Sequence, residues 1–262
     1  RLELATDALL TNRPLDGQLV LPPVQGLEKM SRAVATFTDA AAAALIESVT
    51  GFKAASATNL PKGKALSSSR KNLQVADDLR FFRAIALQSE ARSPLFKGRT
   101  NRILRLALET NQAGGKTVDP VQLEAAVYLH DIGMMLLPES IWLKVGRMSD
   151  DEKLVLRSHP GYAAGLVQRM EGWEEAARMI SQHHEMPDGG GYPQGLRGEE
   201  ICDGAKILAI VDAFEAVMLK HIHRGKNRSV LRAIAEVNAC DNQFAPEWII
   251  PFNSVIRRTI EG

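Results

Sequence analysis

The chain has 262 residues, 45% of them hydrophobic, and its 32 Lys and Arg balance 31 Asp and Glu to a formal net charge of +1. This length is enough for one large domain or two smaller ones, and the balanced charge excludes the basic bias that is typical of proteins that bind nucleic acid polymers. Cys202 and Cys240 are too few for a disulfide framework, the apolar runs are shorter than the roughly 18 residues of a membrane span, and no signal peptide is recognisable, so we expect a cytoplasmic protein without a membrane span.

Frequent Ala and Leu and the scarcity of alternating β-branched runs predict an all-α chain. Residues 1–30 are rich in Pro and turn formers, which favours a loop or short strands, and residues 31–50 have helical apolar spacing. Residues 53–72 have the composition of a linker or surface loop. Further helices are predicted over residues 73–91 and from about Lys97.

These elements predict two parts in the chain. We expect a boundary between residues 60 and 90, where the linker-like stretch lies. Residues 1–90 would then form a smaller, mainly helical region of unknown function, for which a regulatory role is one interpretation. Residues 91–262 would form the main domain.

Helix signals become clearer from residue 119 onward. Asp119-Pro120 pairs an N-cap residue with Pro at the first helical position, and the pattern predicts a helix that continues through the apolar positions to His130 and stops at Gly133. Ser149 and Glu152 form a capping-box pattern that opens another helix. Two more helices are predicted, over residues 173–185 and 204–219.

Ionisable residues interrupt several of these apolar stretches. Four of the six histidines lie beside helix ends or on apolar helices, and two aspartates stand inside apolar runs; these residues are His130, His159, His183, His184, Asp131 and Asp212. Buried charges are costly unless they are paired or bind a metal. One buried His is usually only hydrogen-bonded, but this ordered series predicts a metal site, and imidazole with carboxylate suits Zn, Fe, Mn or Ni.

A glycine-rich segment follows the histidine pair directly. Gly189, Gly190 and Gly191 permit backbone conformations that other residues avoid, and Tyr192-Pro193 comes next. By itself the segment could be a surface turn. Its position after His183-His184 favours a loop shaped over the metal site.

Together these motifs resemble the HD-GYP subgroup of the HD-domain metal-dependent phosphohydrolases, over about residues 95–255. The resemblance is based on the HD doublet at residues 130–131, His159-Pro160, the His-His-Glu run at 183–185, the loop at 188–193 and Val211-Asp212. It implies an HD-domain helical bundle, a divalent metal centre of iron or manganese, and hydrolysis of cyclic di-GMP to pGpG or GMP. It also implies a GGDEF (diguanylate cyclase) domain as a partner at the loop, and because many members dimerise, a homodimer is left open.

The resemblance assigns roles residue by residue. His130 and Asp131 would be catalytic, and the metal ligands would be His130, Asp131, His159, His183, His184 and Asp212. One metal would take His130, Asp131, Asp212 and a histidine one helix upstream. The other would take Asp131 and the three later histidines. The loop that meets the substrate or a partner would comprise Asp188, Gly189, Gly190, Gly191, Tyr192 and Pro193, together with Arg224.

The chain departs from the family pattern at several of these positions. Arg99 stands where the upstream histidine belongs, and a guanidinium cannot ligate a metal. Leu95 stands where trinuclear members have an acidic ligand, and Met134 stands where the family has lysine. The family's Arg-Pro-Tyr-Arg run appears as residues 221–224, where only Arg224 is kept. We therefore expect one well-formed metal site and a second that binds weakly.

Three hypotheses remain open from the sequence. The first is a working cyclic di-GMP phosphodiesterase, and the second is a degenerate HD-GYP protein that binds metal, nucleotide or a partner without efficient turnover. The third, an HD phosphohydrolase acting on another nucleotide, is disfavoured by the Gly-Tyr-Pro loop. His221 and His223 could compensate for the lost charge or be exposed to solvent.

Overall fold

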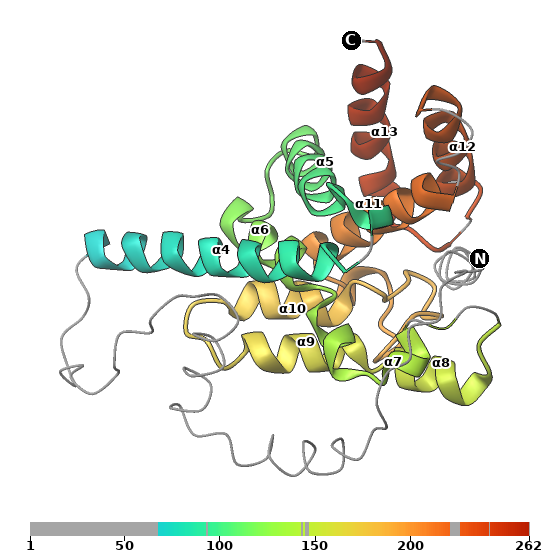
Figure 1. Ribbon diagram of the computed structural model, residues 1–262. Helices are drawn as coiled ribbons and strands as arrows, with labels where there is room; N and C mark the ends of the chain where they lie inside the picture. The colour runs from blue at the N-terminus through green and yellow to red at the C-terminus, as the bar shows by residue number, and fades with distance from the viewer. Residues whose placement is uncertain are drawn as a thin grey trace. The chain divides into compact units, whose positions relative to one another are not determined.

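The computed structural model describes residues 68–92, 94–142, 144, 147–220, 226–240 and 242–261 (Figure 1). Within these residues every regular element is a helix, so the predicted all-α class is confirmed. The predictions for residues 1–50 and for most of the linker lie outside the described residues. Residues 68–72, which we expected to belong to the linker, are helical instead.

The helices follow one another with short connections. Their bounds are α4 Ser68–Glu90, η2 Pro94–Phe96, α5 Arg99–Ala113, α6 Pro120–Leu129, η3 Ile132–Leu136, α7 Glu139–Trp142, α8 Asp150–Leu156, α9 His159–Val167, α10 Glu174–Gln182, η4 Gly198–Glu200, α11 Asp203–Lys220, α12 Lys226–Asn238 and α13 Pro246–Glu261, where η marks a 3-10 helix. Leu73–Gly262 form one compact unit in this arrangement.

Local sequence signals set several of these helix starts. Asp119 accepts a hydrogen bond from the backbone N–H of Val121 at 2.7 Å, and Pro120 occupies the first helical position of α6. Ser149 and Glu152 form the predicted capping box at the start of α8. Both predicted helix starts are therefore confirmed.

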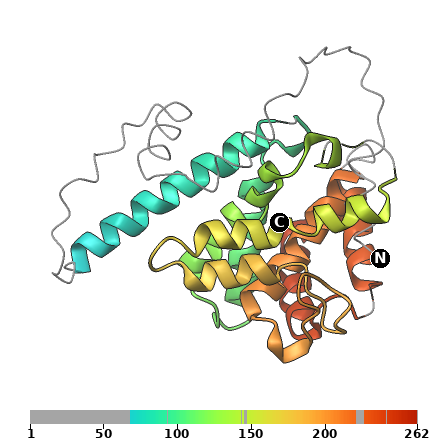
Figure 2. The same ribbon diagram turned by 90° about the horizontal axis from the view of Figure 1, so that it is seen from below.

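The core lies between α11 and the helices that surround it. Helix α11 packs against α5, α10, α12 and α13, and α9 packs against both α10 and η3 (Figures 1 and 2). Helix α4 also contributes to this core, because Phe82 is buried against the edge of Trp173, with ring centroids 5.1 Å apart. The Trp173 indole N–H donates to Asp78 Oδ2 at 2.9 Å, which fixes α4 beside the start of α10.

Two predicted helices end earlier than expected, and in both cases the ends carry histidines. Helix α6 ends at Leu129 rather than at Gly133, and α10 ends at Gln182 rather than at residue 185. After His130 the chain tightens into η3, and Gly133 lies against α9 so closely that a Cβ atom would come within 2.0 Å of the His159 carbonyl oxygen. The HD doublet therefore occupies a break between two helices, not the interior of one.

Among the described residues, no helix combines the length and the apolar character needed to cross a bilayer.

Candidate metal centre

The six predicted ligands converge from four places in the fold. His130 and Asp131 lie between α6 and η3, His159 begins α9, the histidine pair follows α10, and Asp212 lies within α11. The ligand atoms form two sets, in each of which they lie within 4.8 Å of one another. We call His130, Asp131 and Asp212 the aspartate group, and His159, His183 and His184 the histidine group.

Backbone carbonyls fix the orientation of three of the imidazoles. The Nδ1 atoms of His130, His159 and His183 lie 2.9, 2.8 and 2.7 Å from the carbonyl oxygens of Val127, Leu156 and Ile180. A carbonyl oxygen can only accept a hydrogen bond, so each Nδ1 carries the proton. In the neutral tautomer Nε2 then bears a lone pair, as a metal ligand requires.

Two imidazole nitrogens of the histidine group have no hydrogen-bond partner in the described part of the chain. Within the described residues, the Nε2 atoms of His159 and His183, and that of His130 in the aspartate group, are buried and have no hydrogen-bond partner. Buried polar atoms are almost always hydrogen-bonded, so an unpaired nitrogen needs an explanation, and metal binding is one. The donor set thus fits a divalent cation held by imidazole nitrogens.

Burial keeps the histidine group uncharged. It lowers the pKa of His183 to about 3, helped by the positive charge of His130, and it also lowers the pKa of His159 and His184. Three neutral imidazoles that face one another have no protons to expel before a metal binds. This group is therefore preorganised for a cation at neutral pH.

The aspartate group has the opposite electrostatics. Burial alone would lower the pKa of His130, but Asp131 and Asp212 raise it to about 10. Burial alone would raise the pKa of each aspartate, but the charges of His130 and Arg99 lower both. In this group the charges already neutralise one another.

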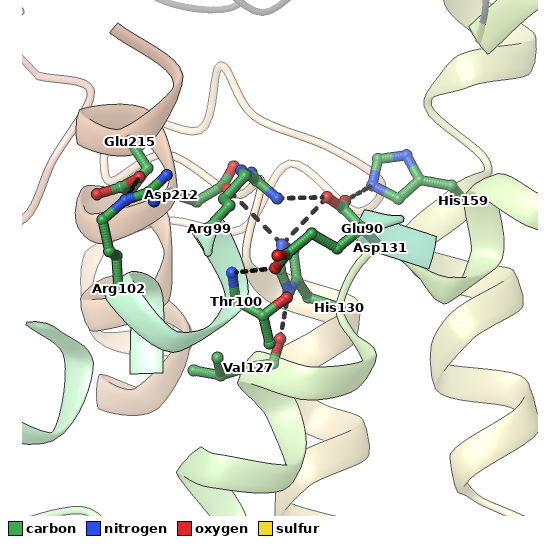
Figure 3. Close-up of polar contacts among 10 residues, drawn as sticks. All are labelled: Glu90, Arg99, Thr100, Arg102, Val127, His130, Asp131, His159, Asp212 and Glu215. Carbon is green, nitrogen blue, oxygen red and sulfur yellow. Dashed lines mark hydrogen bonds and ion pairs between the residues drawn. The ribbon is translucent and has the colours of Figure 1, made fainter. Parts of the chain in front are cut away.

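Asp131 faces both groups. Its Oδ2 atom lies 3.2 Å from His130 Nε2, and its Oδ1 atom lies 3.6 Å from His159 Nε2 (Figure 3). One carboxylate oxygen is thus turned towards each group. This is the arrangement expected of the one residue that the resemblance assigns to both metals.

Arg99 lies at the aspartate group, where the upstream ligand was expected. Its Nη1 donates to Asp131 Oδ2 at 3.4 Å, and its Nη2 donates to Asp212 Oδ1 (Figure 3). A neighbouring pair from the same two helices, Arg102 Nε and Glu215 Oε2, is separated by 2.8 Å. Helix α5 is therefore tied to α11 by two arginines, of which only Arg99 reaches the candidate ligands.

The loop at 188–193 folds back onto the histidine pair. The Tyr192 ring stacks on His184, with centroids 4.7 Å apart, and the Tyr192 N–H donates to the His184 carbonyl at 3.1 Å. Gly191 permits this approach, since a Cβ atom there would lie 2.4 Å from the Met186 nitrogen. Asp188 shapes the turn by accepting from the Gly190 N–H at 2.7 Å, and Gly189 adopts φ 80°.

Glu185 is a functional candidate that the sequence analysis did not identify. Its buried carboxylate accepts hydrogen bonds from the backbone N–H groups of Gln194 at 2.6 Å and Leu196 at 2.9 Å. It thereby anchors the far end of the loop beneath the histidine pair. An acidic residue placed between metal-type histidines and a glycine-rich stretch was the available signal.

Arg224, His221 and His223 lie outside the described residues. Met134 is half-buried in η3 and supplies no charge beside Asp131. No side chain is described for Leu95.

Comparison with protein families matches residues 87–245 to the family described as HD domain. Curated relatives include "Cyclic di-GMP phosphodiesterase response regulator RpfG" from Xanthomonas campestris, 39% identical over 37% of this chain and 26% of its own length. "3'3'-cGAMP-specific phosphodiesterase 3" from Vibrio cholerae is 30% identical over 52% of this chain and 30% of its own length. A "Cyclic di-GMP phosphodiesterase" from Thermotoga maritima is 27% identical over 54% of this chain and 39% of its own length.

The matches with these three relatives thus cover between about a quarter and two-fifths of the relatives' own lengths. Among solved structures, the chain is similar to "Bd1817, a HDG"Y"P protein from Bdellovibrio bacteriovorus", with a TM-score of 0.43 and 19% identity over 60% of this chain and 50% of the other.

Proposed function

Because the chain belongs to the HD-domain family, we propose that it is a metal-dependent phosphodiesterase that hydrolyses cyclic di-GMP to pGpG or GMP. The family recognised from the HD and Gly-Tyr-Pro motifs is confirmed. The observation that carries the proposed activity is the histidine group, in which three neutral imidazoles and one Asp131 oxygen converge.

This donor set would hold a divalent iron or manganese ion, because borderline nitrogen donors with one carboxylate suit both metals. A metal bound there would act as a Lewis acid that activates water and neutralises charge on a phosphate. The chain's own residues prepare the site. Backbone carbonyls hold His159 and His183 in the ligating tautomer, and Asp131 directs one carboxylate oxygen towards them.

The loop supports a substrate role beside this group. Tyr192 covers His184 with an aromatic face, and the Arg157 guanidinium carbon lies 5.2 Å from the centre of the Tyr192 ring. The Tyr192 ring thus joins Arg157 to the histidine group, and arginine can pair with phosphate. An arginine at the edge of a metal site suits a substrate with phosphodiester groups.

Cyclic di-GMP is the substrate we propose, in line with the names of the Xanthomonas and Thermotoga relatives. The Vibrio relative is named for 3'3'-cGAMP, which differs in one base. The test is hydrolysis of both dinucleotides by the Mn²⁺-loaded protein, followed by chromatography. Release of pGpG or GMP supports the proposal, turnover of 3'3'-cGAMP alone would correct the substrate, and turnover of neither would contradict an enzymatic role.

A degenerate member that binds a nucleotide or a partner without efficient turnover is the second candidate, favoured by the position of Arg99 on the two aspartates. Binding of cyclic di-GMP without product would support it. In either case we propose residues 91–262 as the HD-GYP domain, the loop at 188–193 as the surface for a GGDEF domain, and a homodimer as an assembly to test.

A further inference from the structure

Two carboxylate oxygens define the aspartate group, and the same two atoms receive Arg99. Asp131 Oδ2 lies 3.2 Å from His130 Nε2, and Asp212 Oδ1 lies 3.6 Å from it. The Arg99 guanidinium donates to Asp131 Oδ2 and to Asp212 Oδ1 (Figure 3). The guanidinium thus lies against the very atoms that a cation in this group would need.

The second oxygen of Asp131 is not involved in this contact. Asp131 Oδ1 points towards His159, at 3.6 Å, and so belongs to the histidine group. The carboxylate therefore divides its two oxygens between an arginine on one side and imidazoles on the other. A cation in the histidine group does not have to displace Arg99, whereas a cation in the aspartate group does.

Arg99 is a fixed cation in chemical terms. Its guanidinium keeps its charge at any pH a protein tolerates, and its planar fork matches carboxylate oxygens. The side chain is 17% exposed, and its partner Asp212 is 9% exposed. A metal that entered this group would meet a buried positive charge at contact distance, so the residues present do not fit a second metal.

Hydrogen bonds also fix the backbone around Arg99. Arg99 begins α5, and the Glu90 carboxylate accepts hydrogen bonds from the N–H groups on either side of it, those of Gly98 and Thr100. This contact satisfies two N–H donors at the start of the helix. Moving the guanidinium away from the aspartates would leave two carboxylates with His130 as their remaining counter-charge.

We propose that the Arg99 guanidinium takes the place of a metal ion in the aspartate group, and that the chain binds one divalent cation, at the histidine group. The inference rests on the metal-binding part of the proposed function. Arg99 is then a resident counter-charge that holds Asp131 and Asp212 in place, and the site is complete with one metal.

The test is metal stoichiometry, measured by elemental analysis after loading with Mn²⁺ and removal of the excess. We expect one Mn²⁺ per chain in the wild type and two in Arg99→His, because histidine would complete the aspartate group. Arg99→Lys keeps the charge and should bind one. Arg102→His is the matched control on the same helix; its side chain contacts Glu215, not the aspartates, and it should also bind one.

A measurement on the wild-type protein tests the inference even if a variant does not fold. The electron paramagnetic resonance spectrum of Mn²⁺-loaded wild type should show isolated ions at every loading. A spin-coupled pair, or two Mn²⁺ per chain, would overturn this inference while leaving the proposed function intact. No Mn²⁺ in any folded variant would overturn the metal-dependent function as well, so the two failures are distinguishable without an activity assay.

Discussion

The two halves of the candidate centre are in opposite electrostatic states. In the histidine group, burial lowers the pKa of all three imidazoles and keeps them neutral. In the aspartate group, two carboxylates already face a guanidinium and an imidazole. The difference teaches that a cluster of His and Asp side chains is not sufficient for a metal site. A cation is favoured only where the charges of the cluster are not already balanced.

Removing Asp131 should break both halves and give the largest effect. Asp131→Ala deletes a side chain that faces both groups, so we expect loss of bound Mn²⁺ and a fall in hydrolysis of more than about 100-fold. Metal analysis and a turnover assay with cyclic di-GMP check this. Asp150→Asn is the control, since that side chain is 99% exposed at the start of α8. Full metal content in Asp131→Ala would refute the assignment of Asp131.

Removing Arg99 should make the aspartate group depend on metal. Arg99→Ala leaves two carboxylates with only His130 as counter-charge, and because Asp131 is 40% exposed we expect a loss of only about 2–3 kcal/mol in the free energy of unfolding. Denaturant unfolding with and without Mn²⁺ measures it. Mn²⁺ should raise the free energy of unfolding more in Arg99→Ala than in wild type. An equal increase in both proteins would argue against the role of Arg99 as a resident cation.

Loosening the loop should separate substrate binding from metal binding. Glu185→Gln keeps one acceptor oxygen but loses the charge-assisted bonds to Gln194 and Leu196, for which we expect a loss of about 1–2 kcal/mol in stability. Hydrogen exchange of those two amides should accelerate, and KM should rise while metal content stays constant. Glu199→Gln is an exposed control on the same segment. Unchanged exchange rates at the two amides would dismiss the anchoring role.

The smallest expected effect concerns the helix end that carries Arg99. Burial alone would raise the pKa of Glu90, but the backbone N–H groups of Thr100 and Gly98 lower it. A lowered folded-state pKa means that Glu90 stabilises the fold above the unfolded value of 4.5 and loses this contribution as the pH falls through the folded value. In Glu90→Gln, the free energy of unfolding measured by circular dichroism should therefore fall less steeply as the pH is lowered. The same pH dependence in both proteins would contradict the capping contact.

Much of the fold followed from the sequence, because its signals are local. The Asp119-Pro120 start of α6 and the Ser149–Glu152 capping box concern residues adjacent in the chain, and both are present in the structure. The ends of α6 and α10 were placed too late, because they depend on contacts between segments. Gly133 lies against the His159 carbonyl, and no local pattern shows that approach.

The candidate site was predictable in its residues but not in its connections. The order of the His and Asp motifs identified the six side chains that the structure brings together. The sequence also marked Arg99 as a departure from the family pattern. It did not show that the guanidinium contacts both aspartates, because these lie 32 and 113 positions away in the chain. The role of Glu185 was missed for the same reason, because its partners are backbone N–H groups of a folded loop.

Anomalous diffraction from crystals of the Mn²⁺-loaded wild-type protein tests the central claim most directly. The account predicts a single anomalous peak among His159, His183 and His184, within reach of Asp131 Oδ1, with Arg99 still on Asp212. A peak between Asp131 and Asp212, with the Arg99 side chain displaced, would contradict it.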